Sequence, residues 1–499
     1  MLMLQRLVVI GVMLVAADVE AGEPAAEDPA ALAARLDALR VAAESAMRDA
    51  RDVEIPDAYE RCGAAYVELA RAARPAIPAL AAEALYNAAT CFAHGGSVGA
   101  AVTLLSELEH RFPTHPLVAP GLFQSARLYR TIGFYADAAE RLERFAAKYP
   151  TEAEADEALA DAVVLREALG DDKAAERDAA RWITLFGRQR QGEAAAIALH
   201  RALVVRERGS GTDAMAALRG WLRAYGGKAD RAQQARVLLA IGELTWDASC
   251  PVARVDGLCL RRAPAGRGPR CGGPVPLVAV ARDAAGAAEA TKALVQAIRL
   301  TEAGGDAPAR AIAERARLVL ADAAIEAVAA SSMPPPVLDA DGRLTMASAR
   351  AQTDWLGGWQ RALTTASRAL DEVAGSKHLR SAATAQGRAA WLSQHAADTL
   401  ASAPLPAAAA RTPALPDAWR TTYCDAIDVH AEPLRTAARE RADHCLALAG
   451  RGAVVEEAAE CVRVHDRHTG AVASERLPKP ASPTVRDLEP PARYRGPPN

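Results

Sequence analysis

A spacing of small and aromatic residues recurs four times between residues 96 and 226, and it constrains the fold more than any other sequence feature. In each copy a glycine precedes an alanine by five residues, and a large apolar residue follows that alanine by seven. An aromatic residue follows at eleven, and a proline or glycine at twelve. The four pairs are Gly96/Ala101, Gly133/Ala138, Gly170/Ala175 and Gly209/Ala214. The copies repeat every 37 to 39 residues.

This spacing predicts a helical hairpin in each copy. Glycine ends the first helix in the left-handed conformation, which other residues adopt only at a cost. The alanine lets the second helix approach its neighbours closely, and the later apolar residues keep one face of that helix apolar. The final proline or glycine stops the helix. Because one hairpin cannot bury its apolar face alone, the hairpins are expected to stack into a solenoid.

The repeated residues resemble the tetratricopeptide repeat (TPR). The best-matching copy contains Leu122, Ala126, Tyr129, Gly133, Tyr135, Ala138, Leu142 and Pro150. The third and fourth copies depart from the pattern at Arg166 and Ala179. The endings Arg111-Phe112-Pro113 and Lys148-Tyr149-Pro150 are similar to those of exported TPR proteins of the bacterial cell envelope. The resemblance covers about residues 56–246 and implies a surface that binds protein partners.

Composition supports a helical chain. Alanine, the best helix former, supplies roughly a quarter of the residues. We therefore predict an all-α fold, an α-solenoid of TPR-like hairpins followed by further helical hairpins and a disordered proline-rich tail. The formal charge of −3 gives no case for a nucleic-acid partner.

The first residues predict export. Residues 1–21 contain Arg6, a short apolar run and the ending Val19-Glu20-Ala21, which together are typical of a signal peptide. A buried N-terminal helix is the alternative. No later stretch is long and apolar enough to cross a membrane, so no transmembrane segment is expected in the mature chain. Eight cysteines in an exported chain favour disulfides. Inert buried thiols in a cytosolic protein are the alternative.

The remaining chain divides by composition. An alanine-rich helix is expected within 22–55, the TPR-like solenoid over 56–246, and a cysteine-rich loop or linker over 247–280. A helical C-terminal region with cysteines follows over 281–470, with helices expected at 282–303, 309–330, 347–374, 378–402, 432–449 and 453–465. Residues 471–499 form the proline-rich tail, which we expect to be disordered.

The cysteine-containing segments are similar to C-terminal regions of TPR proteins from gliding-motility envelope complexes. The resemblance rests on Tyr423-Cys424, His444-Cys445-Leu446, Glu460-Cys461, Val255 to Cys259, and Arg270-Cys271-Gly272. It implies a role in an envelope assembly. The pairing among Cys250, Cys259, Cys271, Cys424, Cys445 and Cys461 stays open.

The sequence gives little indication of a catalytic, cofactor-binding or metal-binding site. The sequence has no P-loop or HExxH motif, and we expect no catalytic, cofactor-binding or metal-binding residues and no cofactor. A zinc site is the alternative for the cluster of Cys424, His430, His444, Cys445, Cys461, His465 and His468. An enzyme hidden in 280–470 is a further alternative, because catalytic triads are spatial and need not be visible in sequence.

A partner-binding groove is predicted from equivalent positions on the first helix of each hairpin. Aromatic and arginine side chains are common anchors of protein interfaces. The alternative for Phe123 and Leu199 is packing against the next hairpin, and for the arginines solvation at the surface. The predicted groove residues are Tyr86, Phe123, Arg127, Arg130, Glu167, Leu199, Leu203 and Arg206.

A disulfide between Cys62 and Cys91 is predicted from the hairpin formed by Pro56–Ala73 and Pro78–His94. Both cysteines stand at the same height on antiparallel helices, and Gly63, Ala64 and Ala88 permit close approach. Two buried free thiols are the alternative.

Taken together, the sequence predicts a non-catalytic scaffold that binds protein or peptide partners. We expect it to be exported and to act in a periplasmic or outer-membrane-associated complex. A module that binds cell-wall glycan or small ligands, or an enzyme fused to repeats, is the alternative.

Overall fold

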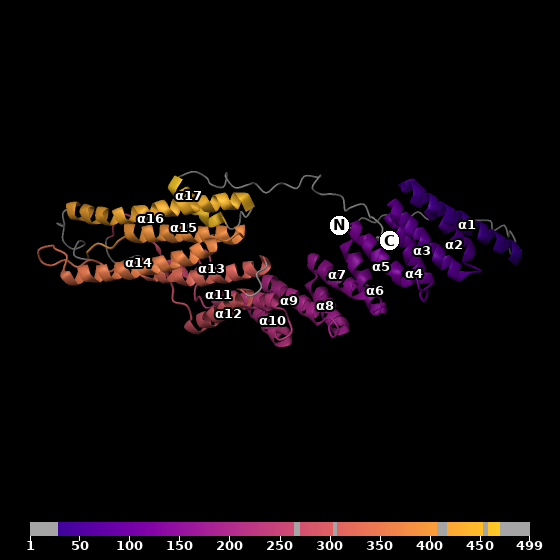
Figure 1. Cartoon of the computed structure of the whole chain (residues 1–499), viewed down its shortest axis with the longest axis horizontal. Coiled ribbons are helices and arrows are strands. Elements are labelled where there is room, and N and C mark those ends of the chain that lie inside the picture. The colour runs from indigo at the N-terminus through magenta and orange to yellow at the C-terminus, as the bar shows by residue number, and fades with distance from the viewer. Residues whose placement is uncertain (1–27, 264–269, 303–306, 407–416, 453–457, 470–499) are drawn as a thin grey trace, which may run out of the picture. The chain divides into compact units, whose positions relative to one another are not determined.

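Helices build almost all of the described part of the chain. The structure, a computed structural model, describes residues 28–263, 270–302, 307–406, 417–452 and 458–469 (Figure 1). The predicted signal peptide 1–21 and tail 471–499 lie outside these residues. The described residues separate into two compact units, one up to residue 175 and one from 176 to 469. The boundary falls inside the predicted solenoid range 56–246. We refer to these as unit 1 and unit 2.

Unit 1 is a row of antiparallel helices in which each packs against the next along the chain. Its helices are α1 (Pro29–Val53), α2 (Pro56–Ala73), α3 (Pro78–Gly95), α4 (Val98–Arg111), α5 (Val118–Thr131), α6 (Tyr135–Lys148) and α7 (Ala155–Ala168). α8 (Asp172–Phe186) begins at the end of unit 1. This consecutive packing of hairpins confirms the predicted solenoid of TPR-like repeats.

Three of the four repeat glycines adopt the predicted left-handed cap. Gly96, Gly133 and Gly170 have φ angles of 87°, 80° and 76°. The residue after each glycine donates its N–H back to a carbonyl in the last turn of the preceding helix. Gly209 differs, because its φ of −96° and ψ of −172° are extended. There Ser210 caps the next helix by accepting the N–H of Asp213, so the chain needs no left-handed residue.

The other repeat positions form the core of each hairpin. Ala101, Ala138, Ala175 and Ala214 are fully buried, and the residues seven positions later are at most 3% exposed. These larger residues are Leu108, Phe145, Trp182 and Trp221. In three copies the aromatic residue four positions further on contacts the buried ring, with centroids 5.7–6.0 Å apart. The recurring spacing is therefore a recurring aromatic contact one helical turn apart.

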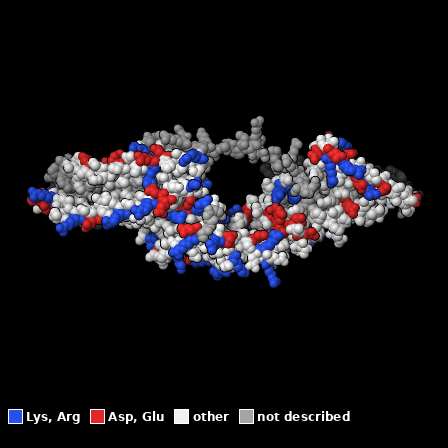
Figure 2. All heavy atoms as spheres, in the orientation of Figure 1, with Lys and Arg blue, Asp and Glu red and all other residues white. Residues whose placement is uncertain are grey.

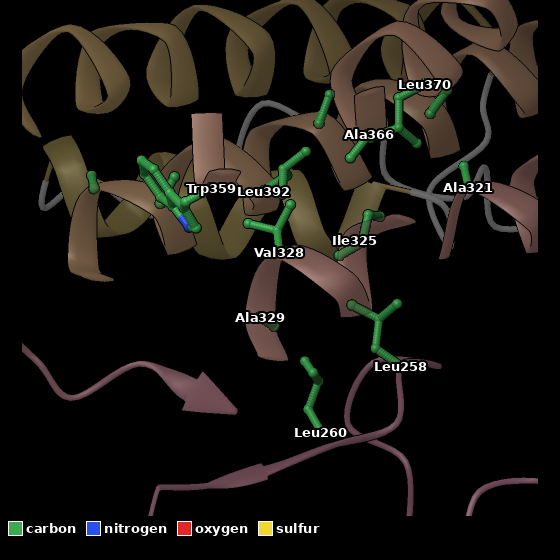
Figure 3. Close-up of a cluster of buried hydrophobic side chains, with 14 of the residues drawn as sticks. Leu258, Leu260, Ala321, Ile325, Val328, Ala329, Trp359, Ala366, Leu370 and Leu392 are labelled. Atoms are coloured by element: carbon green, nitrogen blue, oxygen red, sulfur yellow. The ribbon is translucent and has the colours of Figure 1, made fainter. Parts of the chain in front are cut away.

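Unit 2 continues with longer helices. They are α9 (Gln191–Arg208), α10 (Gly211–Tyr225), α11 (Arg231–Ala248), α12 (Ala284–Glu302), α13 (Ala307–Ala330), α14 (Met346–Ala374), α15 (Leu379–Ala401), α16 (Asp417–Gly452) and α17 (Ala459–Thr469). Between α11 and α12, β1 (Leu260–Arg262) pairs antiparallel with β2 (Leu277–Ala279), with Leu260 opposite Ala279. The main core joins α13, α14 and α15 to this hairpin through Leu258, Ile325, Trp359 and Leu392 (Figure 3).

Two C-terminal helices differ from the sequence prediction. α16 begins at Asp417 and runs through Pro433, although a helix was expected only over 432–449. Proline at 433 resembles a helix start because it lacks an N–H and fits the first turn. Pro433 and Val429, one turn before it, are both exposed, so water can satisfy the carbonyl that proline leaves without a donor. The last helix covers 459–469 and not 453–465, and residues 453–457 lie outside the described part.

Four disulfides pair all eight cysteines. They are Cys62–Cys91, Cys250–Cys259, Cys271–Cys424 and Cys445–Cys461. The first joins α2 to α3, as the sequence analysis placed it, with Cα atoms 5.8 Å apart. The other three settle the connectivity that the sequence left open. Cys424, Cys445 and Cys461, which the zinc alternative took as ligands, are bonded to other cysteines and are not free thiolates.

None of the helices in the described residues combines the length and the hydropathy needed to cross a membrane.

Candidate functional site

A hollow of about 250 Å³ lies on unit 1 where α5, α6 and α7 meet. We call it the α5–α7 hollow. Three of the predicted groove residues, Phe123, Arg127 and Arg130, line it from α5. Their spacing of four and then three residues places them along one face of the helix, as the sequence pattern predicted. The opposite side is acidic, with Glu154, Glu157 and Asp161 from the start and first turns of α7.

Phe123 has two roles in this hollow. Its ring is half-buried and lies 5.2 Å from the ring of Phe145 on α6, measured between centroids. It therefore packs against the same hairpin core as the repeat residues, and its remaining surface lines the hollow. The packing alternative and the binding hypothesis are thus compatible at this position.

The two arginines differ in how they are paired. Arg130 Nη1 donates to Asp161 Oδ2 at 2.7 Å, and both side chains are at least 40% exposed. Such an exposed ion pair contributes at most about 1 kcal/mol to stability. Arg127 is half-buried and makes no hydrogen bond or ion pair with any described residue. The guanidinium that is available for a ligand is therefore that of Arg127.

Acidic side chains dominate the facing wall. Figure 2 shows acidic side chains gathered over the part of unit 1 that carries α6 and α7. Glu154 and Glu157 are exposed and, among the described residues, have no ion-pair partner. After Arg130 and Asp161 neutralise each other, one free arginine faces two free glutamates. The hollow therefore suits a ligand that carries both an anionic and a cationic group.

The acidic wall was not among the predicted groove residues. The sequence analysis took Ala160, Val164 and Glu167 as the positions equivalent to the arginine stripe. In the structure, the face of α7 that meets α5 lies three residues earlier, at 157 and 161. The spacing of Glu154, Glu157 and Asp161, three and then four residues, is the signal that could have identified this face.

The remaining predicted groove residues do not line the hollow. Tyr86 packs half-buried between the α2–α3 and α3–α4 cores, and Glu167 is only 7% exposed. In unit 2, Leu199 is 4% exposed in the core of α9, α10 and α11, and Leu203 packs against that core. Arg206 Nη2 donates to Glu243 Oε2 at 2.6 Å. Packing is thus the role that the structure shows for Leu199 and Leu203.

The contact between Ser381 and His378 does not have the geometry of a catalytic nucleophile and its base. His378 Nδ1 lies 2.8 Å from Ser381 Oγ, and the same nitrogen is 3.9 Å from Glu314 Oε2. A catalytic triad needs the nucleophile and the acid on different ring nitrogens. His378 instead caps α15, because its Nδ1 accepts the backbone N–H of Ser381. The contact between His378 and Ser381 therefore stabilises the start of α15, and its geometry is not that of a catalytic triad.

Comparison with known proteins finds solved structures that are similar to this chain only at low sequence identity and low TM-score. No protein-family model and no curated protein sequence matches the chain. A tetratricopeptide repeat protein from Parabacteroides merdae is 11% identical, covers 68% of this chain and 97% of its own, and has a TM-score of 0.27. BtubC from P. vanneervenii is 15% identical, with coverages of 55% and 92% and a TM-score of 0.26. The TPR domain of P58(IPK) is 11% identical, with coverages of 89% and 96% and a TM-score of 0.21.

The TPR-like fold of this chain is established by its own geometry, since overlaps of that size add no weight. The supporting features are the left-handed glycines, the buried alanines and the consecutive helical hairpins. The chain is an all-α, TPR-like repeat protein whose described cysteines are all disulfide-bonded.

Proposed function

We propose that the protein is an exported, non-catalytic scaffold that binds a protein partner through the α5–α7 hollow, within a periplasmic or outer-membrane-associated complex. The observation that carries this proposal is Arg127, a half-buried guanidinium without a partner among the described residues, beside the ring of Phe123. Arginine and aromatic side chains provide much of the binding energy at protein interfaces. Four disulfides are compatible with export, because disulfides persist in oxidising compartments.

The charges of the hollow describe the segment that it fits. A carboxylate of the partner can pair bidentately with Arg127, and a lysine or arginine of the partner can pair with Glu154 or Glu157. An apolar side chain between these two charges contacts Phe123. The preferred ligand is therefore a peptide segment of mixed charge, and not the uniformly acidic peptide that the two arginines alone suggest.

The test is partner capture from envelope extracts of the native host with the full-length protein and its Arg127→Ala variant. We expect Arg127→Ala to weaken capture of a specific partner at least about tenfold, equivalent to about 1.4 kcal/mol. The variant should keep its helical circular-dichroism signal, because Arg127 makes no hydrogen bond or ion pair with a described residue. Arg71→Ala is the matched control, since Arg71 is an exposed arginine of α2 outside the hollow.

A second variant tests the mixed-charge chemistry. Glu157→Lys should also reduce capture, because it places a cation where the partner's cation is expected. If Arg127→Ala and Glu157→Lys both capture the partner as well as the unmodified protein does, with the fold intact, the hollow is not the binding site.

A further inference from the structure

A second cavity, in unit 2, has the features of a built ligand site. It has a volume of about 310 Å³ and is lined by α15, α17 and the segment 274–277. We call it the α15–α17 pocket. An adjoining hollow of about 490 Å³ shares Gln394, Asp398 and Arg467 with it, and the Cys271–Cys424 disulfide forms part of that hollow's wall. Gln394 and Asp398 are at most 9% exposed, so the polar lining is built into the fold.

The charges that line the α15–α17 pocket are neutralised within the protein. Arg467 donates two hydrogen bonds to the carboxylate of Asp398, at 2.7 and 2.8 Å. The other ion pairs are Arg463 with Asp256 at 2.9 Å and Glu460 with Arg388 at 3.5 Å. A charged ligand would therefore have to compete with an existing partner for each charge, and the wall favours a neutral one.

One buried polar side chain of the pocket, that of His395, has unused hydrogen-bonding capacity. The ring of His395, a residue only 6% exposed, stacks on Trp391 at 4.8 Å, and neither ring nitrogen bonds to a described residue. Burial lowers the pKa of His395 to about 4, so the ring is neutral and offers one donor and one acceptor. Glu460 Oε1 is not such a group: it makes no hydrogen bond among the described residues, but it is the atom that faces Arg388 Nη1 at 3.5 Å.

An unpaired buried polar group costs roughly 1–3 kcal/mol, so native proteins seldom leave one without a role. Such a group lining a cavity points to a ligand that supplies its partners. The ligand must both donate to and accept from the imidazole of His395. A hydroxyl group can do both. Pro276, Leu277 and Val464 supply apolar surface in the same pocket, which suits the C–H faces of a ring.

We propose that the α15–α17 pocket binds a neutral, polyhydroxylated ligand, a sugar ring, with His395 as its hydrogen-bonding residue and the ring of Trp391 beside it. This site lies in unit 2 and does not depend on the peptide-binding function proposed for the α5–α7 hollow, which lies in unit 1. A sugar-binding site would give the scaffold a contact with glycan in addition to its protein partner.

The test is calorimetric titration of the full-length protein with maltotetraose, cellotetraose and chitotetraose, which are neutral tetrasaccharides. We expect at least one to bind with a Kd of about 1 mM or tighter. His395→Phe keeps the ring stacked on Trp391 and removes both nitrogens, so it should weaken that binding at least about tenfold. His430→Phe, at an exposed position of α16, is the matched control and should bind as the unmodified protein does.

Absence of binding by all three tetrasaccharides at about 10 mM would overturn the proposal. Unchanged affinity of a folded His395→Phe variant would do so as well. If this variant does not fold, imidazole ¹⁵N chemical shifts of the unmodified protein replace it. A tetrasaccharide that binds without shifting the His395 signals does not occupy the pocket. The affinity should also be the same at about pH 6 and pH 8, because the ring is neutral at both.

Discussion

Two buried titratable residues of unit 2 influence stability in opposite directions. Burial raises the pKa of Asp322 on α13 to about 6, even though Arg388 Nε lies 3.3 Å from its carboxylate. Burial lowers the pKa of His395 on α15 to about 4. Asp322 therefore binds its proton more tightly in the folded state, whereas His395 binds it more tightly in the unfolded state. Between about pH 4 and 6 the two effects partly cancel.

We predict that His395→Phe makes the protein less sensitive to acid. In the unmodified protein, unfolding allows His395 to take up a proton as the pH falls from about 6.5 to 4. This costs on the order of 3 kcal/mol of stability at the low end. The variant lacks this loss. The measurement is urea unfolding of both proteins at several pH values from 4 to 7.

Asp322→Asn is the control, because it should change the pH dependence of stability in the opposite direction. It removes a carboxyl that favours the folded state at low pH, so stability relative to the unmodified protein should fall as the pH is lowered from 6 to 4. Parallel pH profiles for the unmodified protein and His395→Phe would contradict the burial of a neutral imidazole.

At the scale of elements, the α2–α3 hairpin combines a close helix contact with a covalent bond. Cys62 and Cys91 are both at most 2% exposed, and the Cα atoms are 5.8 Å apart. The aromatic ring of Phe92 occupies the space where Gly63 has no side chain, because a Cβ atom there would lie 2.6 Å from that ring. Glycine thus lets the two helices approach closely beside the disulfide.

We predict that replacing both cysteines of this hairpin by alanine lowers the free energy of unfolding by about 3–4 kcal/mol. Removing the crosslink frees a loop of 29 residues in the unfolded chain. Urea titration monitored by circular dichroism measures the loss. Peptide mapping without reduction is the accompanying control, and an alkylated, free Cys62 in protein from the native host would contradict the bond.

The sequence predicted the elements that depend on local spacing. Repeat alanines, helix-ending glycines and the hairpin cysteines follow from helix geometry, so a single chain reveals them. Gly209 and Pro433 were misread because the same residue type serves two purposes. Glycine also tolerates an extended turn, and proline also fits an exposed position inside a long helix. These outcomes depend on neighbours such as Ser210 and Val429, whose effect appears only in three dimensions.

The candidate site was predicted on one side only. Phe123, Arg127 and Arg130 lie on one face of α5, which the helical period alone determines. The acidic wall depends on how far α7 is shifted along α5, and the repeat period does not specify that shift. The α15–α17 pocket was not predicted, because Trp391 and His395 come from α15, Glu460 from α17 and Pro276 from the loop before β2. Only tertiary packing brings these segments together.

At the scale of the whole molecule, Cys271–Cys424 connects residues 153 positions apart within unit 2. Cys271 lies in a small core with Ala403 and Leu405, and Tyr423, Cys424 and Ile427 from α16 pack against it. Closing a loop of this length lowers the entropy of the unfolded chain. This loss stabilises the folded state by about 5 kcal/mol if the bond is unstrained. The first turns of α16 are the segment that this bond holds.

We predict that replacing Cys271 and Cys424 by alanine exposes the start of α16 to hydrogen exchange. Amides of residues 420–430 should exchange at least about tenfold faster, because their local opening free energy falls. Helices α2–α6 of unit 1 should exchange as before, since repeat units are stabilised mainly by their neighbours. Exchange mass spectrometry measures both regions in one experiment. A uniform change over the whole chain, or no change in α16, would contradict this local role.

The four disulfides share a simple order along the chain. Each cysteine is bonded to the next cysteine in sequence, 62 to 91, 250 to 259, 271 to 424 and 445 to 461. Eight cysteines allow 105 pairings, and this is the one in which every bond closes before the next begins. A chain that is oxidised progressively from its N-terminus reaches this pairing by joining each new thiol to the one still waiting. If each bond forms before the next pair of cysteines becomes accessible, the correct pairing results without the reshuffling of a wrongly paired intermediate.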